Sequence, residues 1–381
     1  MKTQIVLGSL FGDEGKGNTV QWLCKESIAR GEKPLVIRFS GGAQAGHRVI
    51  HNGVEHVCSL FGSGVLLGCD TYLDSQVFVD PVSLRNELHI LGYKLAPLPK
   101  IYVHPNCRVV LPSDILCNRK NKETIEHGTC GCGIFECYKR SIKESIESLN
   151  DDFYSCLQHP EEYLRDRYPE CEELKEADKE FIEACNWLNI FLNWSSLQQL
   201  EDQYDSFIFE GSQGLGLDME CGYMPHCTPS KVGLNGIEAR YLQDAEVYLV
   251  MRTYLTRHGN GYDPDNDGMA EFKLEEPTNL DTGIQGKFKV GYLDLNLLKD
   301  LISRHHLDNY EYKYNCNFNF VFTHMDCIKK GEFFTVLYEY HYSHVNVHEM
   351  VFLLLQNDPL FKLSINKVFG GYSPESDIRE I

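Results

Sequence analysis

Long hydrophobic runs and an excess of basic charge are both missing from this sequence. No apolar run approaches the ~20 residues that a membrane-spanning helix needs. The chain has 36 Lys and Arg against 55 Asp and Glu, a formal net charge of −19. Such a charge argues against general binding of nucleic acid or of an anionic membrane surface. Small anionic substrates are not excluded, because local clusters of Gly, Lys and Arg decide whether those bind.

The first residues of the chain also lack the charged and apolar regions of a secretory signal. We therefore expect a cytoplasmic protein whose fifteen cysteines are mostly reduced and often buried. Cys130 and Cys132 have C-x-C spacing, but no second clustered pair accompanies them. The cysteines therefore do not predict a zinc site.

Length and composition indicate a large folded core. The 381 residues are 43% hydrophobic and 24% charged, which suits one large α/β domain or two intimately joined ones. Apolar runs at Lys2–Leu7 and Pro34–Phe39 predict strands on either side of a helix at Val20–Arg30, and this order predicts a parallel, buried sheet. The other predicted pieces are strands or strand-like segments at Val54–Leu67, Thr71–Val79, Lys100–His104, Ser206–Phe209, Val247–Tyr254 and Phe318–Thr323, and a helix at Asp80–Leu91.

The stretch Gly8–Thr19, GSLFGDEGKGNT, joins the first strand to the helix. Glycines at such a junction let backbone N–H groups approach a phosphate, and Lys16 can add a positive charge. The spacing is not that of a Walker A loop, because Gly8 and Gly15 are two residues too far apart and Gly17 stands where the hydroxyl residue should be.

Two acids, Asp13 and Glu14, lie inside this loop. Carboxylates beside a phosphate are unfavourable unless a metal ion or a proton transfer uses them. Asp13 is therefore a candidate Mg²⁺ ligand, a general base, or both. The alternative is a tight strand–helix turn with solvated acids.

The segment GDEGKG resembles the N-terminal motif of the adenylosuccinate synthetase family, GTP-dependent ligases that join aspartate to IMP. The resemblance covers nearly the whole chain and continues in order through SGGAQAGHRV at 40–49, EHGTCGCGIFECYKR at 126–140, EGSQGLGL at 210–217, GYMPHCTPS at 222–230, TRHGNG at 256–261, DTGIQGKFKVGYLD at 281–294 and THMD at 323–326. It implies an α/β fold with a large, mostly parallel central sheet flanked by helices and glycine-rich ligand loops at strand ends. We expect one domain over residues 1–381, with the acidic, helix-rich stretch 141–203 as a helical subdomain.

The resemblance also implies roles for individual residues. Asp13 would remove the purine N1 proton or bind Mg²⁺, His47 would assist phosphoryl transfer as a general acid, and Gln213 would stabilise the purine 6-oxygen. With Lys16, which would hold the GTP phosphates, these are the catalytic candidates. The nucleotide-binding candidates are Gly12, Glu14, Gly15, Gly17, Asn18, Gly46, Asp326 and Gly371. The substrate-binding candidates are Gln44, Thr129, Arg140, Thr228, Thr282, Lys287 and Lys289. The candidate ligands of Mg²⁺ are Asp13 and Gly46.

Several positions depart from the family pattern. Gln44 replaces an asparagine, His258 an aliphatic residue and His324 a lysine. The family's arginine run is absent, and Lys287 and Lys289 are the cations there. Because arginine holds a carboxylate bidentately and lysine offers a point charge, aspartate could bind in another pose or a different amine could take its place.

Three further alternatives stay open. The acceptor could be dGMP or GMP, as in phage 2-aminoadenylosuccinate synthetases, because the chain is compact, although the retained Asp13 weakens this interpretation. The chain could be a nucleotide-binding regulator, although a mere binder needs no acid–base pair. Asp326, which by resemblance reads guanine and so favours GTP over ATP, could be an ordinary turn residue. A homodimer is also implied by resemblance, with Arg140 reaching the partner's nucleotide or else standing as a solvated helix residue.

Overall fold

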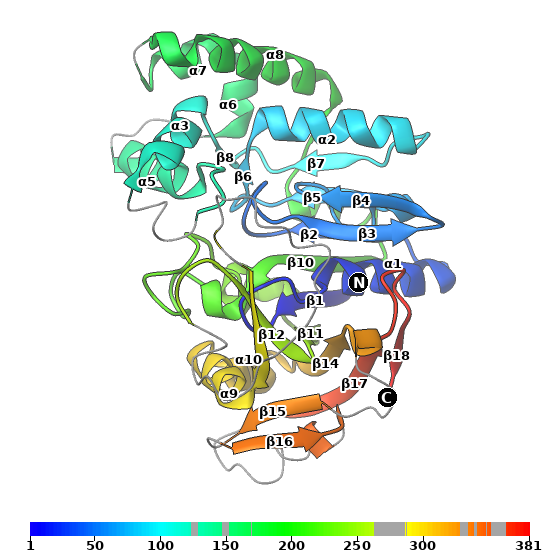
Figure 1. Cartoon of the computed structure of the whole chain (residues 1–381). Coiled ribbons are helices and arrows are strands. Elements are labelled where there is room, and N and C mark those ends of the chain that lie inside the picture. The colour runs from blue at the N-terminus through cyan, green and yellow to red at the C-terminus, as the bar shows by residue number, and fades with distance from the viewer. Residues whose placement is uncertain are drawn as a thin grey trace.

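The structure is a computed structural model of the chain (Figure 1). It describes residues 1–122, 129–146, 152–168, 170–262, 286, 288–327, 334–338, 341–347, 349–351 and 363–381. Across these ranges, no helix is both long enough and apolar enough to cross a membrane.

Helices alternate with strands along much of the chain. The large sheet contains β1 Lys2–Gly8, β2 Pro34–Arg38, β5 Asp70–Leu73, β7 Ile101–Val103, β9 Asn193–Trp194, β10 Ser206–Gly214, β11 Glu246–Arg252, β14 Asn317–Thr323, β17 Ile365–Gly371 and β18 Ile378–Glu380. The smaller sheets contain β3 His47–His51, β4 Val54–Cys58, β6 Phe78–Val79, β8 Arg108–Val109, β12 Tyr254–His258, β13 Phe288–Asp294, β15 Phe334–Tyr338 and β16 His341–Val345. The α-helices are α1 Lys16–Ala29, α2 Pro81–Lys94, α3 Pro112–Lys120, α5 Ile134–Ile146, α6 Phe153–Gln158, α7 Pro160–Arg165, α8 Lys175–Phe191, α9 Leu295–Arg304 and α10 Leu307–Tyr314.

The large sheet confirms the predicted α/β fold with a mostly parallel sheet. Its strands run in the order β18-β17-β14-β11-β1-β10-β2-β5-β7-β9, and every pairing is parallel except that of β17 with β18. β1 therefore lies near the middle of the sheet, between β10 and β11. Helices α6 to α8, which fall in the stretch predicted as a helical subdomain, lie at one end of the molecule, and α8 packs on α2 (Figure 1).

The bounds of two elements differ from the predicted ones beside the first loop. α1 begins at Lys16 rather than at Val20, because Gly15 adopts a left-handed φ of +86° that ends the loop there. β10 does not stop at Phe209 but continues to Gly214. Part of the predicted ligand loop EGSQG is therefore strand, which gives its side chains fixed directions.

Two other predicted strand-like segments are broken by turns. Only Val54–Cys58 of the segment Val54–Leu67 is a strand. At Gly62 the chain passes so close to the sheet that a Cβ would lie 2.5 Å from a methyl carbon of Val36. The segment Thr71–Val79 divides into β5 and β6, which belong to different sheets.

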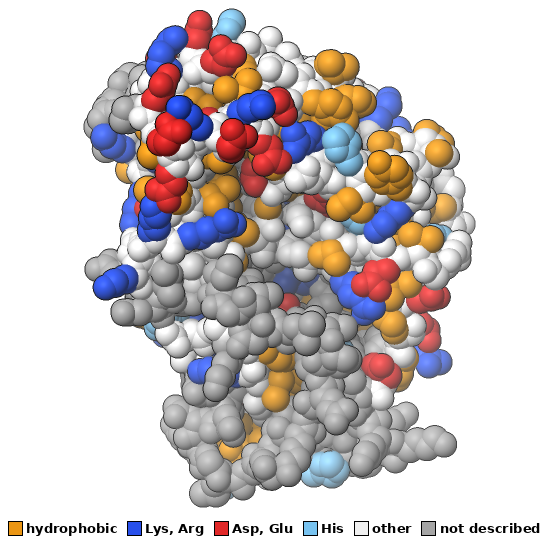
Figure 2. Space-filling model, turned by 45° about the horizontal axis from the view of Figure 1, so that its top comes forward, with side chains coloured by type: hydrophobic (Ala, Val, Ile, Leu, Met, Phe, Trp, Pro, Cys, Tyr) orange, Lys and Arg blue, Asp and Glu red, His pale blue; other side chains and the backbone are white. Residues whose placement is uncertain are grey.

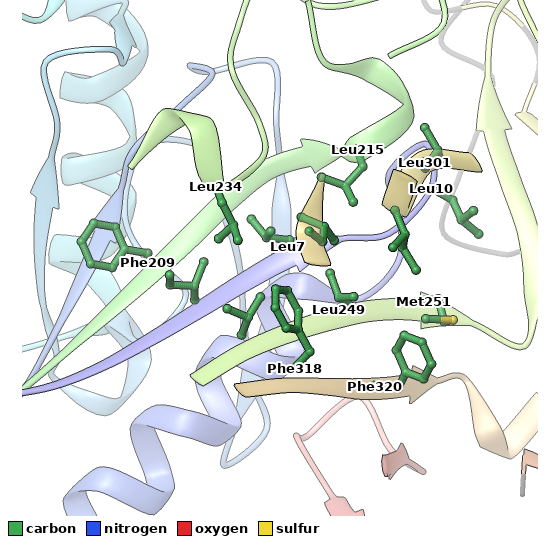
Figure 3. Close-up of a cluster of buried hydrophobic side chains, with 14 of the residues drawn as sticks. Leu7, Leu10, Phe209, Leu215, Leu234, Leu249, Met251, Leu301, Phe318 and Phe320 are labelled. Atoms are coloured by element: carbon green, nitrogen blue, oxygen red, sulfur yellow. The ribbon is translucent and has the colours of Figure 1, made fainter. Parts of the chain in front are cut away.

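Buried side chains from four neighbouring strands fill the core on one face of the sheet (Figure 3). Leu7 on β1, Phe209 on β10, Leu249 on β11 and Phe318 on β14 are at most 1% exposed. Leu10, just beyond β1, joins the same cluster at 2% exposure. Burial of a leucine side chain contributes about 1.5–3 kcal/mol, so the first part of the glycine-rich loop is fixed by the core.

The charged surface at the helical end carries both signs. Figure 2 shows Lys and Arg side chains interspersed with Asp and Glu on this face. Lys120 pairs with Glu173 at 2.6 Å, and Arg85 pairs with Glu180 at 2.8 Å. On this face, acidic and basic side chains therefore alternate, and the acids do not form one continuous acidic patch.

The tight approach of β10 to the first loop gives a stability prediction. A Cβ on Gly214 would lie 2.3 Å from the backbone oxygen of Leu10 and 2.6 Å from the backbone nitrogen of Gly12. We expect Gly214→Ala to lower the free energy of unfolding by about 1–3 kcal/mol, because the backbone must shift to relieve the overlap. Urea unfolding followed by circular dichroism measures the change.

The matched control is Gly92→Ala in α2, where a Cβ meets nothing within 4 Å. Removing a helix-interior glycine should leave the stability unchanged or raise it by about 0.5–1 kcal/mol. Equal stability of Gly214→Ala and the wild type would contradict the packing argument.

Candidate active site

A cavity of about 970 Å³ opens where the central parallel strands end. Its walls include the loops that follow β1, β2, β10 and β14, the ends of β10 and β11, residues of β12, and α5. The carboxyl ends of parallel strands are where ligands bind in open α/β sheets. The predicted site residues that line it are Gly12, Asp13, Glu14, Gly15, Lys16, Gly17, Asn18, Gln44, Gly46, His47, Thr129, Gln213 and Thr228.

Six predicted site residues lie elsewhere or cannot be placed. Thr282 and Lys287 fall outside the described residues. Four others are described but are absent from the cavity wall, namely Arg140, Lys289, Asp326 and Gly371.

Glu14 and Lys16 form a buried ion pair within the glycine-rich loop. Lys16 Nζ lies 3.3 Å from Glu14 Oε2, and the two side chains are 3% and 2% exposed. The backbone N–H of Leu10 donates a 2.6 Å hydrogen bond to Glu14 Oε1. The Glu14 carboxylate also fills the space beside Gly8, where a Cβ would lie 2.0 Å from Glu14 Oε2. Glu14 therefore orients Lys16 from inside the loop.

Asp13 points its carboxylate at a histidine that the sequence analysis did not assign to the site. Its Oδ2 lies 2.9 Å from His258 Nε2, and the Asp13 side chain is 34% exposed. Arg252 donates through Nε to the backbone oxygen of Asp13, whose φ is +57°. Burial acts to raise the pKa of Asp13, but the positive groups around it, His258 first, hold the pKa below its ordinary value. The sequence held one signal for this contact, because a histidine stands at position 258 where the family pattern has an aliphatic residue.

His47 lies against a second buried carboxylate, that of Glu210 on β10. His47 Nδ1 donates to Glu210 Oε1 at 2.5 Å, and Nε2 lies 3.3 Å from the backbone oxygen of Ser212. The imidazolium form thus has an acceptor on each side. Burial lowers the pKa of His47, while the Glu210 carboxylate acts in the opposite direction. Burial also opposes ionisation of Glu210, but His47 and the groups around it lower the pKa of Glu210 to about 2.

Glu210 has further partners and is fully buried. Ser63 donates to it through both its backbone N–H, at 2.9 Å, and its hydroxyl. Arg38 lies opposite Glu210 in the register of the adjacent strand β2 and is also buried, and its charge helps to lower the pKa of Glu210. Glu210 stands in the motif EGSQGLGL, but its role could not be predicted from the sequence, because its partners come from distant parts of the chain.

Several buried polar atoms on the cavity wall have no hydrogen-bond partner within the described part of the chain. Those on amide side chains are both amide atoms of Gln44, Oε1 of Gln213 and Oδ1 of Asn18, and the others are Nη1 of Arg257 and Nδ1 of His258. An unpaired buried polar atom is costly unless water or a ligand satisfies it. These amides therefore fit a polar ligand, and the glycines beside them fit the close approach of phosphate groups.

Thr129 and Arg140 occupy different positions relative to the cavity. The Thr129 hydroxyl donates to Asn118 Oδ1 at 2.7 Å and lies on the wall. Arg140, at 14% exposure, pairs with Asp114 at 3.0 Å and with Glu144 at 2.9 Å in its own chain. This position differs from that of a solvated helix arginine, and a role for Arg140 across a dimer interface stays a prediction.

The segment expected at a nucleotide base follows β14. His324 lines the cavity, and Asp326 is exposed two residues later, in the short 3₁₀ helix Met325–Cys327. Gly371 ends β17 beside the same turn, since a Cβ there would lie 3.6 Å from Thr323 Cα. The role of Asp326 in reading guanine stays a prediction.

Comparison with known proteins gives consistent matches. A family model described as adenylosuccinate synthetase matches residues 5–356. Adenylosuccinate synthetase of Acetivibrio thermocellus is 27% identical over 332 residues, which covers 78% of this chain and 74% of that one. The enzyme of Ehrlichia chaffeensis is 28% identical over 338 residues, with coverages of 78% and 73%.

Two solved structures share the fold. Fully ligated adenylosuccinate synthetase from Plasmodium falciparum superposes with a TM-score of 0.68 at 19% identity and covers 99% of each chain. Cyanophage S-2L succinoaminodeoxyadenylate synthetase, solved bound to dGMP and to dATP as an energy donor, gives a TM-score of 0.63 at 14% identity. That match covers 100% of this chain and 95% of the phage chain.

The buried Glu210 carboxylate gives a prediction for the pH dependence of stability. Its folded pKa of about 2 lies below the ordinary 4.5, so its contribution is present above pH 4.5 and is lost as the pH falls toward 2. A shift of this size corresponds to roughly 3 kcal/mol. We expect the free energy of unfolding of the wild type to exceed that of Glu210→Gln, and this excess to shrink between about pH 4.5 and pH 2.

Urea unfolding at each pH measures this difference. Glu180→Gln, which removes a 52% exposed carboxylate paired with Arg85, is the matched control and should change stability by less than about 1 kcal/mol. A wild-type excess over Glu210→Gln that stays constant across the pH range would contradict the prediction.

Proposed function

Because the chain belongs to the adenylosuccinate synthetase family, we propose that it transfers the γ-phosphoryl group of GTP to the 6-oxygen of IMP and then replaces that oxygen with the amino group of aspartate. The products would be adenylosuccinate, GDP and inorganic phosphate. Members of this family are ligases that form C–N bonds with GTP as phosphoryl donor, so the chain is an enzyme of that class. One observation supports the specific proposal most: Asp13, Lys16, His47 and Gln213 line a single cavity.

Each of these residues has a distinct task in the proposed reaction. The Asp13 carboxylate, with its lowered pKa, accepts the purine N1 proton, which moves negative charge onto the 6-oxygen. That oxygen then forms a bond to the γ-phosphorus as the bond to the GDP oxygen breaks. Gln213 stabilises the charge that develops on the purine oxygen. His47, whose Nδ1 is held by Glu210, exchanges the 3.3 Å contact of its Nε2 with the Ser212 backbone oxygen for a hydrogen bond to the transferring group. The amine then attacks C6, and phosphate leaves.

The glycine-rich loop is suited to hold the triphosphate. α1 begins at Lys16, directly after the left-handed Gly15. Because both residues line the cavity, the N-terminus of the helix is part of the cavity wall. Backbone N–H groups at such a position bind phosphate, and Lys16 adds a positive charge. Gly12 has a φ of +100°, and no atom of the described residues lies within 4 Å of where its Cβ would be.

Mg²⁺ fits the same place. The Asp13 carboxylate and the Gly46 carbonyl, both on residues of the cavity wall, are oxygen donors of the kind that Mg²⁺ prefers. The partial exposure of Asp13 leaves its carboxylate accessible from the cavity. When bound, Mg²⁺ neutralises phosphate charge during transfer.

A second candidate acceptor is dGMP. The phage synthetase solved with dGMP matches this chain over its whole length, which supports this alternative at the level of the fold. The retained acid at position 13 favours IMP as acceptor, and a carboxylate at position 326, which by resemblance to the family would read guanine, favours GTP as donor. We further propose that the whole chain, including the stretch 141–203, acts as one catalytic unit and that the enzyme is a homodimer.

Assays of all combinations of purine acceptor, phosphoryl donor and amine donor test the proposed reaction. IMP, dIMP, GMP and dGMP are combined with GTP or ATP and with aspartate or other amino acids, and phosphate release is followed. We expect release with GTP, IMP and aspartate, reduced at least about 100-fold in Asp13→Ala and in His47→Ala. Asp166→Ala, which changes a 58% exposed acid, is the control and should retain wild-type turnover. Full activity in both cavity variants would contradict the mechanism, and acceptance of dGMP alone would establish the second candidate.

Removal of divalent metal should stop the reaction. We expect EDTA to abolish phosphate release and added Mg²⁺ to restore it, because the triphosphate charge must be neutralised. Asp13→Asn should raise the Mg²⁺ concentration needed for half-maximal rate, if measurable turnover remains. Undiminished phosphate release in EDTA would rule out the metal requirement.

A further inference from the structure

Arg257 is a buried positive charge on the cavity wall that has no acidic partner among the residues that the structure describes. Its side chain is 2% exposed and lines the cavity. Burial lowers the pKa of Arg257 to about 10, and the Cys227 thiol is the titratable group that acts against this shift. In the described part of the chain, no carboxylate pairs with it, although acids exceed bases by 19 in the sequence. A buried charge without a partner is costly.

The protein holds this guanidinium in one orientation. Arg257 Nε donates to the backbone oxygen of Asn260 at 3.0 Å, and Nη2 donates to that of His226 at 3.3 Å. The guanidinium carbon lies 4.2 Å from the centre of the Phe11 ring. Gly261 lets the loop fold over it, because a Cβ there would lie 2.3 Å from Nη2. The remaining nitrogen, Nη1, is buried and has no hydrogen-bond partner among the described residues.

Three other cations on the same wall pair with acids. Lys16 pairs with Glu14 at 3.3 Å, Arg48 with Glu55 at 2.7 Å and Lys139 with Glu136 at 3.6 Å. Arg252 donates to the backbone oxygen of Asp13 and lies over the Tyr254 ring, and its charge lowers the pKa of Asp13. Arg257 differs from the three paired cations in having backbone carbonyls and an aromatic ring around it, but no acid among the described residues.

We propose that Arg257 binds a carboxylate of the amine donor through Nη1, an inference that rests on the proposed function. The phosphates have the glycine-rich loop and Lys16, whereas the donor's carboxylate needs a cation near the reacting edge of the purine. Arg257 is adjacent to His258, which contacts Asp13, the proposed acceptor of the purine proton. Lys289 lies opposite Arg257 in the β12–β13 register and adds a second positive charge to this strand pair.

The test compares amine donors in Arg257→Gln and Arg257→Lys. We expect the KM for aspartate to rise roughly 10- to 100-fold in Arg257→Gln, the range for one hydrogen bond to a charged group, with little change in the KM for IMP or GTP. Arg257→Lys should recover part of the loss. The control is Arg304→Gln, which also removes an arginine stacked on an aromatic ring, Tyr223 at 4.5 Å, but one that is 44% exposed and paired with Asp300.

Donor analogues identify the carboxylate. Asparagine and isoasparagine each replace one carboxylate of aspartate with an amide, and the wild type should disfavour both. Arg257→Gln should lose the discrimination against one of the two analogues and retain it against the other. An unchanged preference for aspartate over both analogues would overturn the proposal.

The alternative anion is the nucleotide phosphate, and the assay separates it. If the KM for IMP rises instead, and the preference for IMP over inosine disappears in Arg257→Gln, the guanidinium binds the 5′-phosphate and the proposal is wrong. A rise in every KM together with a lower unfolding temperature in both Arg257 variants would show a structural role and also overturn it.

Thermal unfolding separates this proposal from the reaction itself. In the presence of IMP and GDP, aspartate should raise the unfolding temperature of the wild type and of Arg304→Gln, but not that of Arg257→Gln. If no mixture releases phosphate while this pattern holds, the proposed function fails and the carboxylate site stands. If aspartate raises the unfolding temperature of none of the three proteins, or raises it equally in all three, the carboxylate site is disproved.

Discussion

The buried Glu210 carboxylate is the interaction on which the site's geometry depends most. It is fully buried and joins three parts of the chain: β10, on which it lies, the segment that carries Ser63, and His47 at the start of β3. A charge in this environment is tolerated only while its partners remain in place. The side of the cavity that carries His47 is therefore rigid, and the imidazole is oriented before any substrate binds. Electrostatic preorganisation of this kind accounts for much of the rate enhancement in many enzymes.

The cavity wall combines two kinds of polar group. Lys16, His47 and Asp13 are each held by a partner from the protein. Gln44, Gln213 and Arg257 instead present buried atoms that have no partner in the described ranges. The first kind suits groups that must be fixed in place for chemistry, and the second suits groups whose partners arrive with the substrate. The residues expected to take part in phosphoryl transfer are therefore held in place by protein partners before any substrate binds.

The sequence predicted the elements around β1 well, and for a physical reason. Apolar runs and glycine turns are local signals, so the β-α-β order, the parallel sheet and the loop at Gly8–Thr19 followed from neighbouring residues. Ion pairs between distant segments gave no such signal. Glu210 is 163 positions from its partner His47, and Asp114 came beside Arg140 only because α3 packs on α5. The contact of His258 with Asp13 depends likewise on β12 folding back beside the first loop.

The lack of space beside Gly8 has an evolutionary consequence. Since the Glu14 carboxylate occupies the volume that a larger side chain at position 8 would need, these two sites are sterically coupled. An alanine at position 8 would displace the end of the Glu14 side chain, and with it the group that holds Lys16. We expect lineages of this protein to change both positions together or neither, a pattern of covariation that arises from steric exclusion rather than from attraction.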